Sequence, residues 1–306
     1  MGILEAMLKI VLAMVLGFFL YRRHILNDES NMAMSKLITY GAAPCMIFSS
    51  VCSLDAGKRS EVITLLIAGV VLYILLAALA FIGALAIRPE KRERGSYEAM
   101  MTYGNSAFLA FPIGQALMGD LGVSYLAILN IHQNVFAHSY GVFQLTRGKE
   151  GKFKFSPAKL VSPTVICAVI ALILYIAGVR VPEPVLVPID SVGQMTSPLA
   201  MVVTGATIAS YPFKNLFNNW RYYVAGIIKL TVIPMIAFII AFAVWGAGNL
   251  ASVIGLHCCM PTAVIISIIA MINGADYKLI SSGTGLMNIM CVGTIPLMWV
   301  IFGLFG

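Results

Sequence analysis

Apolar runs, each about as long as a membrane-spanning helix, recur from one end of this chain to the other. A helix needs about 20 mainly apolar residues to cross the hydrocarbon core of a bilayer. The stretches between the runs are too short to fold as separate soluble domains. Charged residues make up 11% of the 306 residues, where a soluble domain has roughly 25%. The sequence therefore predicts an all-α polytopic membrane protein in which residues 1–306 form a single membrane domain.

Polar loops divide the chain into ten predicted transmembrane helices. Their boundaries are residues 3–20, 32–53, 61–87, 97–118, 122–144, 158–178, 185–210, 219–246, 249–272 and 281–303. The first of them lacks a preceding basic region and a following small-residue cleavage site. We therefore expect it to remain as the first spanning helix.

The positive charges in the loops predict the orientation in the membrane. Fourteen lysines and arginines fall on one side: Arg22, Arg23, Arg88, Lys91, Arg92, Arg94, Arg147, Lys149, Lys152, Lys154, Lys159, Lys214, Arg221 and Lys278. Only Lys58, Arg59 and Arg180 fall on the other. The positive-inside rule places the larger set in the cytoplasm and both termini outside. We expect the plasma membrane, which is the inner membrane in a bacterium. Because topology accounts for the net charge of +7, no nucleic-acid partner is expected.

A basic cytoplasmic loop, residues 145–157, divides the ten predicted helices into five and five. The second half, 158–306, must then insert upside down relative to the first half, 1–144, which is the organisation of an inverted repeat. Two pairs of prolines occupy corresponding positions in the two halves and so support the repeat. Pro44 and Pro198 are 198 − 44 = 154 positions apart, and Pro112 and Pro261 are 261 − 112 = 149 positions apart.

Pro112 and Pro261 lie in the middle of the predicted fourth and ninth helices, where a proline removes a backbone hydrogen bond and clashes with the preceding turn. A simple kink is one interpretation. The other is a pair of broken helices whose half-helix N-termini face one cavity and favour an anion, especially a carboxylate. Asn105 and Ser106 precede Pro112 by about two turns, and Thr262 follows Pro261. These polar neighbours favour the second interpretation.

The predicted fifth helix is unusually rich in amide and imidazole groups: Asn130, His132, Gln133, Asn134 and His138. Polar side chains at membrane depth are costly and usually face a cavity or the interior of the bundle. Asn288 in the tenth helix lies 288 − 134 = 154 positions after Asn134, matching the offset of Pro44 and Pro198. The alternative for both asparagines is hydrogen bonding that only joins helices.

Other residues carry weaker signals. A structural role is the favoured interpretation for His132, His138 and His257. Lys229 is a cation well inside the predicted eighth helix and is expected to pair with a helix C-terminus or snorkel. Six cysteines lack the paired spacing of a zinc site. Paired carboxylates like those of an antiporter core, nucleophile–base motifs and phosphate-binding glycine loops were not found, so we expect a protein that is not an enzyme and needs no metal or cofactor.

Several segments resemble the auxin efflux carrier family of membrane transporters, which includes bacterial members and the plant PIN carriers. The most specific is Asn105–Pro112 (NSAFLAFP), which has the family's asparagine seven positions before the crossing proline. Met260–Ala263 (MPTA), Ser197–Ala206 and Lys229–Pro234 resemble the family's ninth, seventh and eighth helices. The resemblance covers nearly the whole chain, which lacks the long soluble loop of some plant carriers.

The resemblance implies ten helices in two inverted five-helix repeats, with broken fourth and ninth helices crossing at Pro112 and Pro261, a fold similar to that of bile-acid transporters and the NhaA antiporter. It implies a homodimer held by a scaffold of helices 1, 2, 6 and 7, with a moving transport domain made of the others. Family members carry organic anions, among them indole-3-acetate and dicarboxylates such as malate or malonate.

The resulting hypothesis is a secondary transporter or uniporter for a small organic anion, working by elevator-type alternating access within the lipid bilayer. The predicted substrate-binding residues are Asn105, Ser106, Pro112, Gln133, Asn134, Pro261, Thr262 and Asn288. Two alternatives remain open at this point. One is a sodium-coupled symporter of the bile-acid transporter type, and the other is a membrane sensor or scaffold that binds a ligand without moving it.

Overall fold

A computed structural model describes residues 3–147, 162–211, 217 and 219–305. Over these residues the chain is built of helices, as predicted, and the only β-type pairing there is one isolated bridge. Five helical runs in this part are long and apolar enough to cross a membrane: Ala56–Ile87, Phe108–Thr146, Glu183–Ser210, Trp220–Trp245 and Tyr277–Gly303. This is the architecture of a polytopic α-helical membrane protein.

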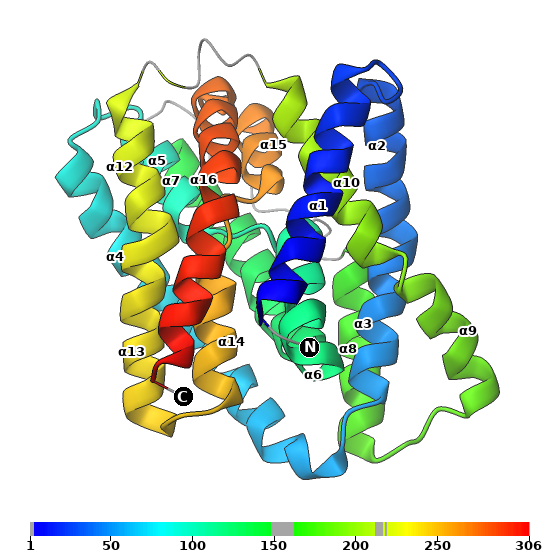
Figure 1. Ribbon diagram of the computed structural model, residues 1–306. Coiled ribbons are helices and arrows are strands. Elements are labelled where there is room, and N and C mark those ends of the chain that lie inside the picture. The colour runs from blue at the N-terminus through cyan, green and yellow to red at the C-terminus, as the bar shows by residue number, and fades with distance from the viewer. Residues whose placement is uncertain (1–2, 148–161, 212–216, 218, 306) are drawn as a thin grey trace. The chain divides into compact units, whose positions relative to one another are not determined.

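Figure 1 shows the order of the helices along the chain. Up to residue 147 they are α1 (Ile3–Arg22), α2 (Asp28–Leu37), η1 (Ile38–Ala42), α3 (Ala43–Cys52), η2 (Ala56–Lys58), α4 (Arg59–Ile87), α5 (Arg94–Thr102), η3 (Ser106–Ala110), α6 (Phe111–Phe136), η4 (Ala137–Gly141) and α7 (Val142–Thr146). From residue 162 they are α8 (Pro163–Ala177), α9 (Glu183–Gly193), α10 (Thr196–Ser210), α12 (Trp220–Ile227), η6 (Ile228–Val232), α13 (Ile233–Trp245), α14 (Asn249–Cys258), α15 (Val264–Ile272) and α16 (Tyr277–Gly303).

Every predicted transmembrane segment contains helix, and most ends agree closely. The predicted helix 61–87 corresponds to α4, and 281–303 corresponds to α16. Most of the predicted basic loop 145–157 lies outside the described residues. The predicted helix 185–210 is not one helix but two, α9 and α10, because the chain turns between them. Pro198 lies in the first turn of α10, where its missing N–H needs no partner.

Three prolines are accommodated by wide helical turns and not by breaks. The π-helical turns η1, η3 and η6 each end two residues before a proline, which is Pro44, Pro112 and Pro234 respectively. A proline in a regular α-helix removes one hydrogen bond and clashes with the carbonyl of residue i−4. The wider π turn relieves that conflict, because its bonds already skip a residue. These helices therefore continue through their prolines.

The chain divides into two compact units. Unit 1 comprises Met1–Ile67, Ser106–Ile131 and Val161–Ser210; unit 2 comprises Ala68–Asn105, His132–Leu160 and Tyr211–Gly306. The helices α4 and α6 contribute residues to both units, whereas α1 to α3 and α8 to α10 lie wholly in unit 1 and α12 to α16 wholly in unit 2.

In unit 1, α1 packs along α10 (Figure 1). Small residues permit the close approach: a Cβ added to Gly17 would collide with the backbone of Val202, and one added to Gly205 would collide with the backbone of Met14. Such small-residue contacts let helices associate in membranes, where both helices and lipid tails are apolar. Asn31 adds a hydrogen bond from its side-chain amide to Thr207 Oγ1 at 3.0 Å. Unit 1 is thus held by backbone proximity and a few polar links.

In unit 2, α13 packs against α14, and α16 contacts α12, α14 and α15 (Figure 1). Phe238 on α13 and Phe302 on α16 stack with ring centroids 4.3 Å apart. Gly255 on α14 lies beside them, because a Cβ there would meet the Phe302 ring at 2.7 Å. These apolar contacts hold the helices around the polar elements described below.

Candidate functional site

Two interrupted helices of unit 2 cross and pair their backbones at the interruption. The first ends with α5 at Thr102, and the second ends with α14 at Cys258. Between these helix ends and the next helices, Gly104 and Thr262 form an antiparallel bridge. The Asn105 N–H donates to the Pro261 carbonyl oxygen at 2.8 Å, and the Ala263 N–H donates to the Tyr103 carbonyl oxygen at 3.1 Å. The crossing thereby satisfies backbone groups that two broken helices would otherwise leave unpaired inside a membrane.

Gly104 is required by the closeness of this approach. A Cβ at Gly104 would lie 3.0 Å from the Cβ of Met260 and 3.3 Å from the His257 carbonyl oxygen. Both distances are tighter than ordinary van der Waals contact, so a larger residue would push the two segments apart. The glycine directly before Asn105 therefore lets the two segments pair this closely.

The predicted break at Pro112 was wrong. The chain leaves the helix at Tyr103–Asn105, and helix resumes with η3 at Ser106, so Pro112 is the second residue of the continuing α6. The π turn η3 accommodates the proline, as described above. The prediction for Pro261 was better, because this proline lies in the extended segment itself and its carbonyl accepts a hydrogen bond across the crossing.

Thr262 fastens the crossing to neighbouring helices. Its hydroxyl donates to the Met100 carbonyl oxygen at 2.8 Å and lies 3.2 Å from Met287 Sδ on α16. The side chain of Thr262 is fully buried. This hydroxyl joins the second broken helix to the last turn of α5.

Gln133 joins the crossing to α4 and α14. Its Nε2 donates to the Gly104 carbonyl oxygen at 2.7 Å, and its Oε1 accepts from the Tyr73 hydroxyl at 3.0 Å. The same hydroxyl lies 2.7 Å from His257 Nε2. Tyr73, Gln133 and His257 are all buried. A continuous polar chain thus runs from the crossing into the interior of unit 2.

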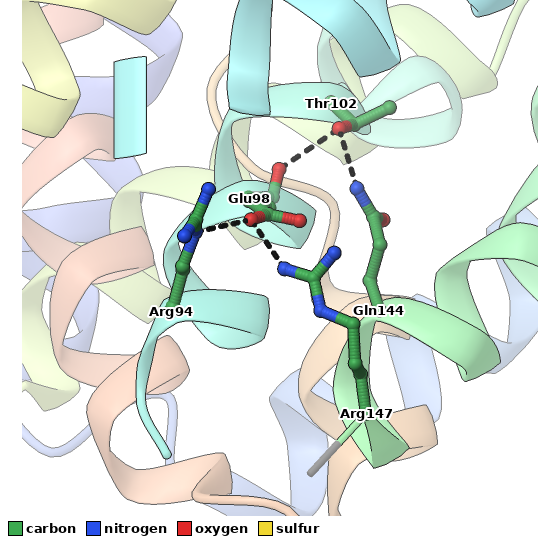
Figure 2. Close-up of polar contacts among 5 residues, drawn as sticks. All are labelled: Arg94, Glu98, Thr102, Gln144 and Arg147. Atoms are coloured by element: carbon green, nitrogen blue, oxygen red, sulfur yellow. Dashed lines mark hydrogen bonds and ion pairs between the residues drawn. The ribbon is translucent and has the colours of Figure 1, made fainter. Parts of the chain in front are cut away.

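A buried carboxylate fixes the helix that leads into the crossing. Figure 2 shows Glu98 on α5 between Arg94 of the same helix and Arg147, which follows α7. Glu98 Oε1 accepts from Arg94 Nε at 3.0 Å and from Arg147 Nη2 at 2.6 Å. The Gln144 amide donates to Thr102 Oγ1 at 3.4 Å, and that hydroxyl donates to the Glu98 carbonyl oxygen (Figure 2). These contacts hold α5 against α7.

Four of the eight predicted site residues meet at the crossing: Asn105, Gln133, Pro261 and Thr262. Asn288 follows Met287 on α16 and is buried. Its side chain interacts with the hydroxyl of Tyr211, and its Oδ1 has no hydrogen-bond partner. Asn134 is half-buried, and its carbonyl oxygen lies 3.0 Å from His138 Nδ1. Ser106 and Pro112 are buried residues of unit 1.

Sequence reasoning missed Gly104, Tyr73 and the partners of Glu98. Gly104 directly precedes Asn105, the asparagine of the family resemblance. A glycine before a polar residue in an apolar helix could have indicated where the helix is interrupted. Tyr73 is a lone hydroxyl in a long apolar stretch, which gave no pattern. Asp190 lies within the predicted span 185–210 and was also overlooked; it accepts a hydrogen bond from Ser49 Oγ at 3.0 Å.

Lys229 does not snorkel. It lies in η6 with 1% of its surface exposed. Its expected pairing with the partial negative charge of a helix C-terminus stays a prediction. The ion pairs between described residues do not include Lys229. The described residues also hold no group of three or more metal-ligating side chains.

A polytopic helical bundle with a backbone crossing at two interrupted helices is an architecture of secondary transporters. Residues 2–159 and 152–299 match the family described as membrane transport protein. The protein belongs to this family, the auxin efflux carrier family, and is a membrane transporter.

Relatives that align with this chain over most of their length are named as transporters. An uncharacterized transporter of Methanocaldococcus jannaschii is 21% identical over 292 residues, covering 91% of this chain and 92% of its own. One of Methanothermobacter thermautotrophicus is 22% identical, covering 98% and 99%. The uncharacterized transporter YfdV of Escherichia coli is 23% identical, covering 78% and 77%. These matches agree with a transporter that is not an enzyme.

Proposed function

We propose that the protein moves a small organic anion with a carboxylate group, such as a dicarboxylate or an auxin-like acid, as a secondary transporter or uniporter. The backbone crossing carries this proposal. The helix α15 begins at Val264 directly after the crossing, and no side chain caps its N-terminus. The free N–H groups and partial positive charge of such an end favour an anion.

Polar side chains at the crossing supply the remaining recognition. Asn105 follows the bridged Gly104 and is 6% exposed. Asn105 and Asn134 would hydrogen-bond the carboxylate, with Gln133, Thr262 and Asn288 of the same unit completing the substrate site beside Pro261. An amide can donate to a carboxylate without adding a charge that must be desolvated.

The architecture that we propose is ten transmembrane helices in two inverted repeats, 1–144 and 158–306, with both termini outside. The loop charges of fourteen against three support this orientation through the positive-inside rule. The basic loop 145–157 and the Glu98 cluster would then lie toward the cytoplasm of a plasma membrane.

We further propose an elevator mechanism in a homodimer. Unit 2 contains the whole backbone crossing and the polar chain behind it, which suits it to carry the substrate. Unit 1 contains the helices α1 to α3 and α8 to α10, which correspond to the scaffold that the family resemblance implies. A second copy of the chain would bind through this scaffold, and lipid would surround the dimer.

The test is counterflow in proteoliposomes, in which labelled malonate, malate or indole-3-acetate exchanges against the unlabelled acid. Asn105→Ala should weaken the apparent affinity about 10- to 150-fold, because a hydrogen bond to a charged ligand is worth about 1.5–3 kcal/mol. Asn31→Ala is the matched control, since it removes an amide that bonds Thr207 in unit 1. It should lower thermal stability while leaving the affinity near that of the wild type.

Three outcomes would contradict parts of this proposal. Binding of the acid without counterflow would indicate a sensor. Counterflow that requires sodium would indicate a symporter of the bile-acid transporter type. Reduced stability with unchanged affinity in Asn105→Ala would assign Asn105 to the structure of the bundle and not to the substrate site.

A further inference from the structure

The polar chain behind the crossing determines which nitrogen of His257 carries its proton. The Gly104 carbonyl can only accept, so the atom of Gln133 that faces it at 2.7 Å must be the amide nitrogen. Gln133 Oε1 therefore faces the Tyr73 hydroxyl and accepts its proton. A phenol has one proton, so the contact between Tyr73 and His257 Nε2 requires the histidine to donate.

His257 is consequently the Nε2–H tautomer, with a lone pair on Nδ1. That nitrogen is buried and has no hydrogen-bond partner in the structure. The side chain as a whole is 2% exposed. A buried acceptor without a partner is unfavourable in a protein interior. The hydrogen bonds of Tyr73 do not require the Nδ1 lone pair, because they use Nε2 of His257 and Oε1 of Gln133. The lone pair is therefore available to a proton or to a donor group of a ligand.

Titratable side chains approach His257 from three elements besides its own. Tyr73 comes from α4, His132 from α6 and Lys229 from η6, and the last two lie near enough to His257 to interact electrostatically with its ring. On α14 itself, Cys258 is the adjacent residue. The packed helices α13 and α16 carry no Asp, Glu, Lys, Arg or His between Ile233 and Trp245 or between Leu279 and Gly303.

The balance of these charges couples proton binding to anion binding. His257 lies in the last turn of α14, whose partial negative charge favours an imidazolium. Burial of the His257 ring, and after it the nearby Lys229, oppose a second positive charge, and the buried Glu98 is already paired with two arginines. An anion arriving at the crossing would offset the added charge. Each ligand then strengthens binding of the other, because the coupling between two sites is reciprocal.

We propose that Nδ1 of His257 is a proton-binding site and that the protein is a proton–anion symporter. A proton from water on one side binds the Nδ1 lone pair when the anion binds, and it returns to water on the other side when the anion leaves. No electron or further reactant is involved. This inference rests on the proposed transport of an anion at the crossing.

The tautomer is tested on the purified full-length protein with nitrogen-15-labelled histidine in lipid nanodiscs. His257→Gln identifies the resonances, because glutamine retains an N–H donor for Tyr73 but lacks Nδ1. We expect a protonated Nε2 and an unprotonated Nδ1 above neutral pH, with Nδ1 gaining a proton at higher pH when malonate, malate or indole-3-acetate is added. A proton on Nδ1 above neutral pH, or a ring that does not titrate with any of these acids, would overturn the proposal.

A second variant keeps this test independent of how His257→Gln folds. Tyr73→Phe preserves the stacking of the ring on Phe136, at 5.3 Å between centroids, and removes only the hydroxyl. Without the hydroxyl the Nε2–H loses its acceptor, so a mixture of the two tautomers should appear. An unchanged tautomer in Tyr73→Phe would show that the polar chain does not select it.

Coupling is tested in proteoliposomes with whichever acid shows counterflow. We expect one proton to enter with each anion, His257→Gln to abolish this proton uptake, and the control His24→Asn, at an exposed histidine, to retain it. Counterflow without proton uptake in the wild type would overturn the symport and leave anion transport standing. Absence of counterflow with all three acids would refute the proposed transport and the symport with it.

Discussion

Replacing Glu98 with glutamine should destabilise the protein strongly, although the two side chains have nearly the same shape. Glu98 is fully buried and accepts two charge-assisted hydrogen bonds on one oxygen. Removing one partner of a buried ion pair costs about 3–5 kcal/mol. The side chains of Arg94 and Arg147 remain 29% and 34% exposed, so water would solvate part of their charge. We therefore expect a smaller loss of stability, about 2–4 kcal/mol, after allowing for that screening.

The assay is chemical unfolding in mixed detergent micelles, with Glu90→Gln as the matched control. Glu90 pairs with Arg92 at 3.1 Å, but both side chains are largely exposed, and such pairs contribute about 0–1 kcal/mol. Adding Arg147→Gln should cost less in the Glu98→Gln background than in the wild type, because the arginine has then lost its partner. If Glu98→Gln unfolds like the wild type, or if the two changes simply add, Glu98 does not hold α5 as we infer.

Three further outcomes follow from the packing and the charges. Gly104→Ala should destabilise by about 1–3 kcal/mol and slow counterflow, because its Cβ would press on Met260 and the His257 carbonyl; normal stability and rate would show that the crossing can widen. Gly205→Ala should cost a similar amount, about 1–3 kcal/mol in the same unfolding assay, because it forces α1 away from α10; unchanged unfolding would place that packing in doubt. A reporter fused after Gly306 should be active outside the cytoplasm, and activity only inside would refute the proposed topology.

The positions of the helices could be predicted because they depend on local information. A span needs a run of apolar residues of a given length, and the loops are polar. This is why the predicted 61–87 and 281–303 agree with α4 and α16 to within a few residues. Where a wide turn or a short interruption lies inside a span, as between α9 and α10, the apolar pattern continues and conceals it.

The position of the first break could not be predicted from the proline. Pro112 lies in a helix that a π turn lets continue, whereas the break at Gly104 exists because another segment, Pro261–Ala263, supplies the hydrogen bonds. That pairing joins residues far apart in sequence. Asn105, Gln133, Pro261 and Thr262 were still identified, because polar residues and a proline at membrane depth are costly and must have a local use.

The partners of the buried polar side chains also depend on long-range packing. Glu98 lies near the start of the predicted span 97–118, but nothing in the sequence connects it to Arg147, 49 positions later. Tyr73 acquires its role only from the proximity of Gln133 and His257. The sequence can thus show that a polar residue at membrane depth is unusual, but only the folded structure shows which group forms its hydrogen bonds.

The distribution of these bonds bears on how an anion could be moved. The two backbone bonds of the crossing, the Gln133 and Thr262 contacts and the Glu98 ion pairs all join residues within unit 2. A mechanism that pulled the two broken helices apart would break several of these bonds. No water is present there to replace them, and each unsatisfied polar group would cost roughly several kcal/mol. Movement of unit 2 as one body would break none of them. The elevator mechanism proposed above requires internal bonding of this kind, because it keeps the crossing closed while the anion is moved.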